Sequence, residues 1–197
     1  MIALPAASAP ARPRLVFVGT ALACTAGSML FAGLLGAYLN ARQVAGGTTA
    51  KWLPAGTIMP GIATNVLLIV MIFAVIMASW AVYAVRRGSR TDAYIALGLT
   101  ALFGLAALNA QVYIWRQMKI GILKPKSETF ALFFYSVTGT LFAVVLTGVI
   151  FAGVMAFRTA GGRSTPKDAE ALSAHTLYWY FLTAATVAVW AVVYVNK

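Results

Sequence analysis

The sequence predicts an all-α integral membrane protein, a bundle of five helices that each cross the bilayer. Hydrophobic residues make up 61% of the 197 residues and charged residues only 10%, whereas about a quarter of the residues of a soluble domain are charged. The charged residues are also confined to the gaps between long apolar segments. Each of these five segments exceeds the roughly 20 residues that a helix needs to cross the hydrocarbon core.

The chain is predicted to form one membrane domain over residues 15–197, preceded by a flexible Ala- and Pro-rich tail over residues 1–14. Prolines within the tail prevent a continuous helix there. The predicted spans cover residues 15–41, 60–85, 93–115, 129–157 and 171–195. An outer-membrane barrel is excluded, because its strands are about 10 residues long and alternate polar with apolar residues.

Small residues recur at every fourth position in two of the predicted spans. These positions are Ser28, Ala32 and Gly36 in the first span, and Ala96, Thr100 and Gly104 in the third. Lipid is as apolar as leucine, so close van der Waals contact is a main source of attraction between membrane helices. The sequence therefore predicts helix-packing seams at both sets of positions.

The polar residues within the spans are few and neutral. Asn65, Asn109 and Gln111 carry amides that are costly to expose to lipid. Hydrogen bonds to other helices are the predicted role of these amides, and contact with a substrate is the alternative. His175, the single histidine, lies near the start of the fifth span and is grouped with these intramembrane polar contacts.

No pattern of a catalytic, cofactor or metal site is found. A haem or metal site needs clustered His, Cys, Met or carboxylate ligands, and the chain has one histidine and one cysteine, Cys24. Every acidic residue lies outside the spans, so neither a Ser-His-acid triad nor an intramembrane proton relay is expected. The net charge of +11 comes from cations that flank the spans. We expect this chain to bind no cofactor itself and to have no nucleic-acid partner.

Several short motifs occur in a recognisable order along the chain. They are Phe31-Ala32-Gly33-Leu34-Leu35-Gly36-Ala37-Tyr38, Trp52-Leu53-Pro54-Ala55-Gly56, Asn65-Val66-Leu67-Leu68, Gln111-Val112-Tyr113 and Tyr178-Trp179-Tyr180-Phe181. In the order and spacing of these motifs and in its number of spans, the chain resembles subunit III of the haem–copper cytochrome c oxidases, in the shorter bacterial form with five spans. The family-motif positions singled out are Trp52, Pro54, Gly56, Tyr178 and Trp179.

The resemblance implies a non-catalytic accessory subunit of a cytochrome c oxidase in the inner (plasma) membrane of a bacterium. It implies that haem and copper lie in the partner subunits I and II, which this chain would contact and stabilise. It also implies a structural phospholipid, in a cleft between the first two spans as a pair and the other three. Two alternatives stay open: a subunit III-like accessory protein of a nitric oxide reductase, and an unrelated small membrane transporter or assembly factor.

The chain departs from the family pattern at the ionisable positions within the spans. The membrane glutamates of the family align with Gly27 and Ile114, and the histidine and aspartate of its last span align with Tyr180 and Thr183. These departures favour a structural role over a role in proton uptake.

The orientation is predicted from the positions of the cations. The side that holds the N-terminus carries eight Lys and Arg and the opposite side seven, and the compact cluster of Arg86, Arg87 and Arg90 favours the cytoplasm for the first side. We therefore predict that a reporter active only in the periplasm gives a signal when it is fused after Lys197. A cytoplasm-active reporter at the same position should be silent, and a signal from it alone would contradict this orientation.

Overall fold

The computed structural model describes residues 14–46, 52–53, 57, 59–118, 129–162 and 169–195. The long helices are α1 (Leu15–Val44), α3 (Gly61–Arg86), α4 (Arg90–Met118), α5 (Thr129–Ala160) and α6 (Glu170–Val189), and α6 continues as the π-helix η2 (Trp190–Val195). Five helices, with α6 and η2 counted together, are long and apolar enough to cross a membrane. The predicted all-α membrane bundle is confirmed.

The helices extend past the predicted spans at several ends. α4 begins three residues before the predicted start at residue 93, because Asp92 lies in its first turn and accepts a hydrogen bond from the Ser89 hydroxyl at 2.7 Å. A negative charge there also suits the positive end of the helix dipole. Charged residues therefore mark the membrane boundary without ending the helices.

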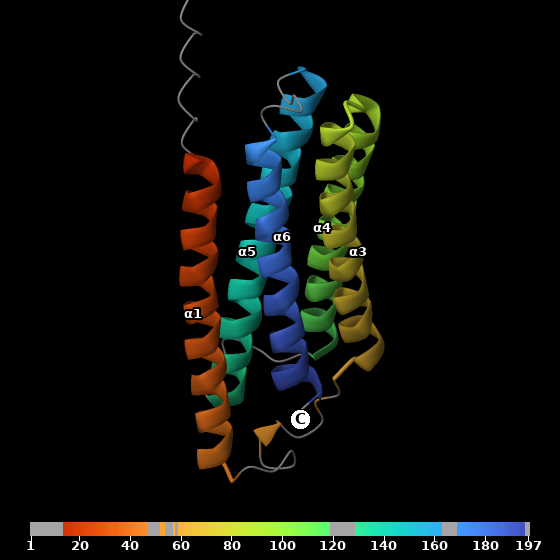
Figure 1. The fold of residues 1–197 in the computed structure, drawn as a ribbon. Helices are drawn as coiled ribbons and strands as arrows, with labels where there is room; N and C mark the ends of the chain where they lie inside the picture. The colour runs from red at the N-terminus through yellow and green to blue at the C-terminus, as the bar shows by residue number, and fades with distance from the viewer. Residues whose placement is uncertain are drawn as a thin grey trace, which may run out of the picture.

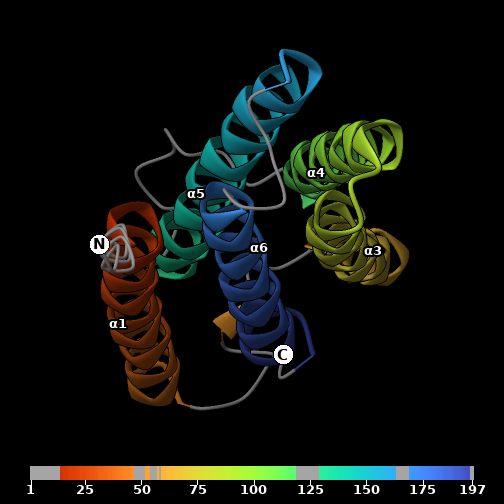
Figure 2. The same cartoon turned by 45° about the horizontal axis from the view of Figure 1, so that its top comes forward.

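The last helix, α6, lies at the centre of the bundle. It packs against α1, α3 and α5, while α4 packs against α3 and α5. Figures 1 and 2 show α6 between α1 on one side and α3 on the other. The resemblance implied a cleft that separates the first two spans, as a pair, from the other three. This expectation is wrong, because α6 lies between α1 and α3.

Four hydrogen bonds join α6 and η2 to α3. They link Thr176 Oγ1 to the Ala78 carbonyl at 3.0 Å, the Tyr180 hydroxyl to the Ser79 hydroxyl at 3.1 Å, Thr183 Oγ1 to the Met71 carbonyl at 3.2 Å, and Trp190 Nε1 to Asn65 Oδ1 at 3.0 Å. Thr176, Thr183 and Trp190 are spaced seven residues apart, so they lie on one face of the helix. We call this set of contacts the α3/α6 seam.

Glycines bring α4 and α5 close to the buried Trp179 of α6. A Cβ atom added at Gly104 would lie 2.7 Å from the Trp179 ring, and one at Gly148 would lie 2.6 Å from Leu182. Trp179 itself is fully buried. The largest side chain of the core therefore fills the space that two glycines leave open.

The α3/α6 seam makes a prediction about Thr176, which is buried and bonds only across the seam. Thr176→Val keeps the shape of the side chain and removes the donor. Stability should therefore fall by about 0.6 kcal/mol, the average measured for hydrogen bonds between membrane helices, and by no more than about 1.7 kcal/mol, the largest value. The measurement is the midpoint of thermal aggregation in detergent.

Thr25→Val is the matched control, because Thr25 is exposed and its hydroxyl bonds to the Ala21 carbonyl of its own helix. Equal midpoints for the two variants would contradict a stabilising contact at Thr176.

Candidate functional site

Two of the four predicted intramembrane polar residues are engaged in hydrogen bonds that tie the end of α6 to its neighbours. Gln111 of α4 is buried, and its amide bonds to the Tyr194 hydroxyl of η2 at 3.3 Å. Asn65 of α3 is exposed and accepts from Trp190 of η2. The π-helical segment η2 thus contacts α3 through Trp190 and α4 through Tyr194, at one end of the bundle. π-helical turns are often found at functional sites.

His175 is fully buried, and its ring nitrogens have different surroundings. Nε2 accepts a hydrogen bond from Trp179 Nε1 at 2.9 Å, and the ring meets Phe151 edge-on with centroids 5.1 Å apart. Since Nε2 accepts, the neutral ring carries its proton on Nδ1, which has no hydrogen-bond partner among the described residues. The lone pair that would ligate a haem iron is already used, so His175 does not fit an axial ligand.

No metal cluster is assembled elsewhere in the part of the chain that the structure describes. Groups of three or more His, Cys, Asp or Glu side chains that could hold a metal ion do not occur there.

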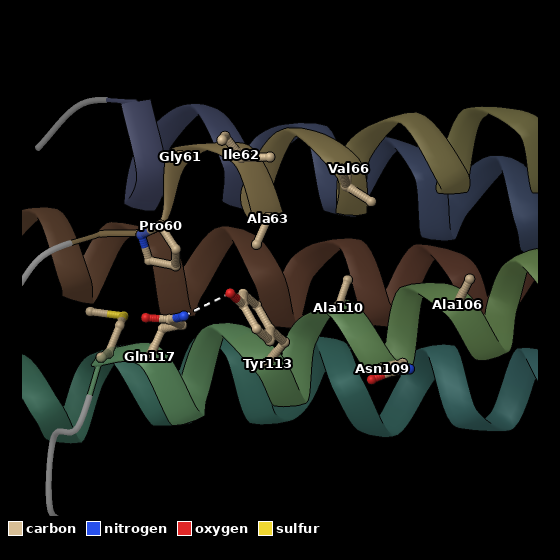
Figure 3. Close-up of a pocket in the computed structure, with 11 residues that line it drawn as sticks. Pro60, Gly61, Ile62, Ala63, Val66, Ala106, Asn109, Ala110, Tyr113 and Gln117 are labelled. Carbon is tan, nitrogen blue, oxygen red and sulfur yellow. Dashed lines mark hydrogen bonds between the residues drawn. The ribbon is translucent and has the colours of Figure 1, made fainter.

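The fourth predicted polar residue, Asn109, faces a groove between α3 and α4. The groove has a cavity volume of about 820 Å³ and lies between the start of α3, at Pro60 and Gly61, and the end of α4, at Gln117 and Met118 (Figure 3). Asn109, Tyr113 and Gln117 are its polar lining, all contributed by α4. The groove opens at the end of the bundle where η2 holds the two helices.

A second groove, of about 550 Å³, lies between α1 and α6. Ser28 and Ala32 line it from α1, and Ala184 and Ala188 line it from α6. These four side chains are small, so a neighbouring helix could approach closely at these positions. Bulkier residues, among them Leu177, Tyr180 and Phe181, line the rest of the groove. No charged residue is among its described lining.

The two predicted helix-packing seams have different surroundings. Ala96, Thr100 and Gly104 are all buried, between α4 and its neighbours. Ser28, Ala32 and Gly36 are exposed, and a Cβ atom at Gly36 would meet nothing within 4 Å. The described helices therefore form no seam at the α1 positions, because α1 turns Phe31, Leu35 and Tyr38 toward the bundle instead.

Trp52 and its neighbours form an aromatic cluster at the same end of the bundle as η2. Trp52 is buried, and its Nε1 donates to the Tyr38 hydroxyl at 3.0 Å. Its ring meets both Tyr38 and Phe130 edge-on, with centroids 5.4 and 5.5 Å apart. Trp52 thus packs the start of the connection after α1 against α1 and α5. The other two positions of this motif, Pro54 and Gly56, lie outside the described residues.

The remaining motif positions, Tyr178 and Trp179, are packed between α5 and α6. Tyr178 donates its hydroxyl to the Val144 carbonyl of α5 at 2.9 Å, and Trp179 bonds to His175 within α6. Tyr178 therefore joins α6 to α5, while Trp179 packs against Gly104 of α4, and neither residue lines one of the two grooves.

Glu170 has a role that the sequence analysis missed. As the first residue of α6 it lies partly buried, and its Oε1 accepts from the Phe17 N–H of α1 at 3.0 Å. The first N–H groups of a helix have no partner within it, and a carboxylate there also suits the helix dipole. This contact holds the start of α1 against the start of α6, although the two segments are 153 residues apart in sequence.

The seven-residue spacing of Thr176, Thr183 and Trp190 was the available signal for the α3/α6 seam. Four-residue spacings of small residues do not reveal this pattern, because its members are seven residues apart. A polar heptad in an apolar helix indicates a hydrogen-bonding face.

The chain is similar to several proteins named cytochrome c oxidase subunit 3. No family model matches it. The "Probable cytochrome c oxidase subunit 3" of Mycobacterium leprae (strain TN) is 30% identical over 188 residues, which cover 93% of this chain and 89% of that protein. The protein of the same name from Mycobacterium bovis is 29% identical over 183 residues, with the same coverage. The "Cytochrome c oxidase subunit 3" of Synechocystis is 26% identical over 188 residues, 92% of this chain and 76% of that protein.

Proposed function

The chain belongs to the cytochrome c oxidase subunit 3 family, and on that premise we propose that it is a non-catalytic subunit of a respiratory haem–copper oxidase. In this role it stabilises the complex and binds lipid in the plasma membrane of a bacterium, with its N-terminus in the cytoplasm. The names of its relatives favour this function over that of a nitric oxide reductase accessory protein or a transporter.

Haem and copper are proposed to lie in the partner subunits I and II. The one histidine of this chain does not fit a haem ligand, because it is buried and its Nε2 accepts a hydrogen bond from Trp179. Several polar side chains of the bundle join one helix to another, as Thr176, Gln111 and Tyr178 illustrate. This chemistry suits a scaffold.

The observation that carries the proposal is the exposed row of small residues on α1. Ser28 and Ala32 line the groove between α1 and α6, and Gly36 continues the row. In the part of the chain that the structure describes, these three positions are exposed, yet small residues at four-residue spacing are typical of close helix contacts. A transmembrane helix of a partner subunit supplies the missing side of that contact.

The proposal predicts that Ala32→Leu weakens the complex without unfolding the chain. Overpacking a close contact costs about 1–3 kcal/mol, and here that cost falls on the partner contact because Ala32 is exposed in the isolated chain. The measurement is the haem absorbance that co-purifies with a tagged chain, divided by the amount of that chain. We expect haem with the wild type and a clear loss with Ala32→Leu.

Ala26→Leu is the matched control, because Ala26 is also exposed on α1 and is not part of the groove lining. A wild-type preparation without haem would refute the oxidase role. Equal haem with Ala32→Leu and Ala26→Leu would refute the α1 contact.

A further inference from the structure

The groove between α3 and α4 has an uncharged but strongly hydrogen-bonding wall. None of the lining residues that the structure describes is Asp, Glu, Lys, Arg or His. Asn109, Tyr113 and Gln117 follow one another at four-residue intervals, so they lie on one face of α4 and span about 12 Å along its axis. Figure 3 shows them along one edge of the groove, opposite Pro60 and Ala63 of α3.

The hydrogen-bonding capacity of this wall is only partly used. Gln117 Nε2 donates to the Tyr113 hydroxyl at 2.7 Å, which leaves the hydroxyl hydrogen of Tyr113 free to donate elsewhere. Asn109 makes no hydrogen bond within the described part of the chain. It lies nine residues before Met118, the last residue of α4, and therefore about 14 Å inside the helix. An unpaired amide at that depth is costly in lipid.

The shape of the groove favours a chain-like molecule over another helix. Small, half-buried residues, Ala63 and Ala110, lie between the two helices, whereas Ile62 and Tyr113 at the edges are 84% and 50% exposed. Helix backbones approach each other where the bordering residues are small, and these bulky edges keep a helix out. The cavity of about 820 Å³ lies within the usual range for small-molecule sites.

We propose that the α3/α4 groove binds an uncharged amphiphile whose carbonyl or hydroxyl oxygens accept hydrogen bonds from Asn109 and Tyr113. Its hydrocarbon chain lies against Ala63, Val66 and Ala106, deeper in the bilayer. The absence of charge from the described lining disfavours an anionic or zwitterionic headgroup within the groove. A neutral glycerolipid and a quinone share the required chemistry, a carbonyl-bearing neutral head on a long apolar tail. This inference deepens the lipid-binding part of the proposed function and rests on it.

The test compares the amphiphiles retained by the tagged chain, purified with whatever partners accompany it. Organic extracts of the wild type and of the double variant Asn109→Leu/Tyr113→Phe are analysed by mass spectrometry, per mole of chain. Each lost hydrogen bond weakens binding about fivefold, so the double variant should keep about a tenth or less of the wild-type amphiphile. The control is the double variant Asn40→Leu/Tyr94→Phe, which removes an amide and a phenol that are exposed outside the groove. This variant should retain the wild-type amount of the amphiphile.

The identity of the lost molecule decides its source. Fatty acids released by alkali from a phosphorus-free molecule identify a neutral glycerolipid, and redox-dependent ultraviolet absorbance identifies a quinone; either result supports the proposal. Equal retention by the two double variants would overturn it, as would the selective loss of a charged phospholipid alone. Haem is measured in the same preparations. A wild-type preparation without haem would refute the oxidase role. The comparison of the extracts would still show whether the α3/α4 groove binds the amphiphile.

Discussion

The hydrogen bonds of the α3/α6 seam are the contact on which the rest of the bundle depends. Inside a bilayer a polar side chain finds no water, so it is stable only against another polar group of the protein. Thr176, Thr183 and Trp190 meet this requirement on α3. They thereby place α6 between α1 and α3 (Figure 2). The fifth of the described spans is therefore the central helix of the fold.

Both grooves follow from this central position. Because α6 separates α1 from α3, α1 packs on one side only, and its row of small residues faces outward beside Ala184 and Ala188. On the other side, η2 reaches α3 through Trp190 and α4 through Tyr194. It therefore bonds to both helices that form the α3/α4 groove, at the end where the groove opens. One surface thus suits a helix and the other a chain-like ligand.

The sequence predicted the helices well and their neighbours poorly, for a physical reason. Length, hydropathy and the placement of charge determine which segments cross a bilayer. They say little about which face of a span meets which neighbour, because lipid and protein interior are equally apolar. Four-residue spacing therefore indicated a close contact at Ser28, Ala32 and Gly36 but could not tell a contact within the chain from one with a partner. The bond from Phe17 to Glu170 joins distant segments and left no local signal.

Cross-linking in native membranes tests the central position of α6 most directly. With Cys24 replaced by Ser, the pair Ser79→Cys and Tyr180→Cys should be joined by a short bifunctional thiol reagent, because the native side chains touch at 3.1 Å. The comparison pair is Thr25→Cys with Ser79→Cys; Thr25 lies ten residues after the start of α1, as Tyr180 does in α6. We predict efficient linking of the first pair and none of the second. Linking of Thr25 to Ser79, without linking of Tyr180 to Ser79, would contradict the arrangement.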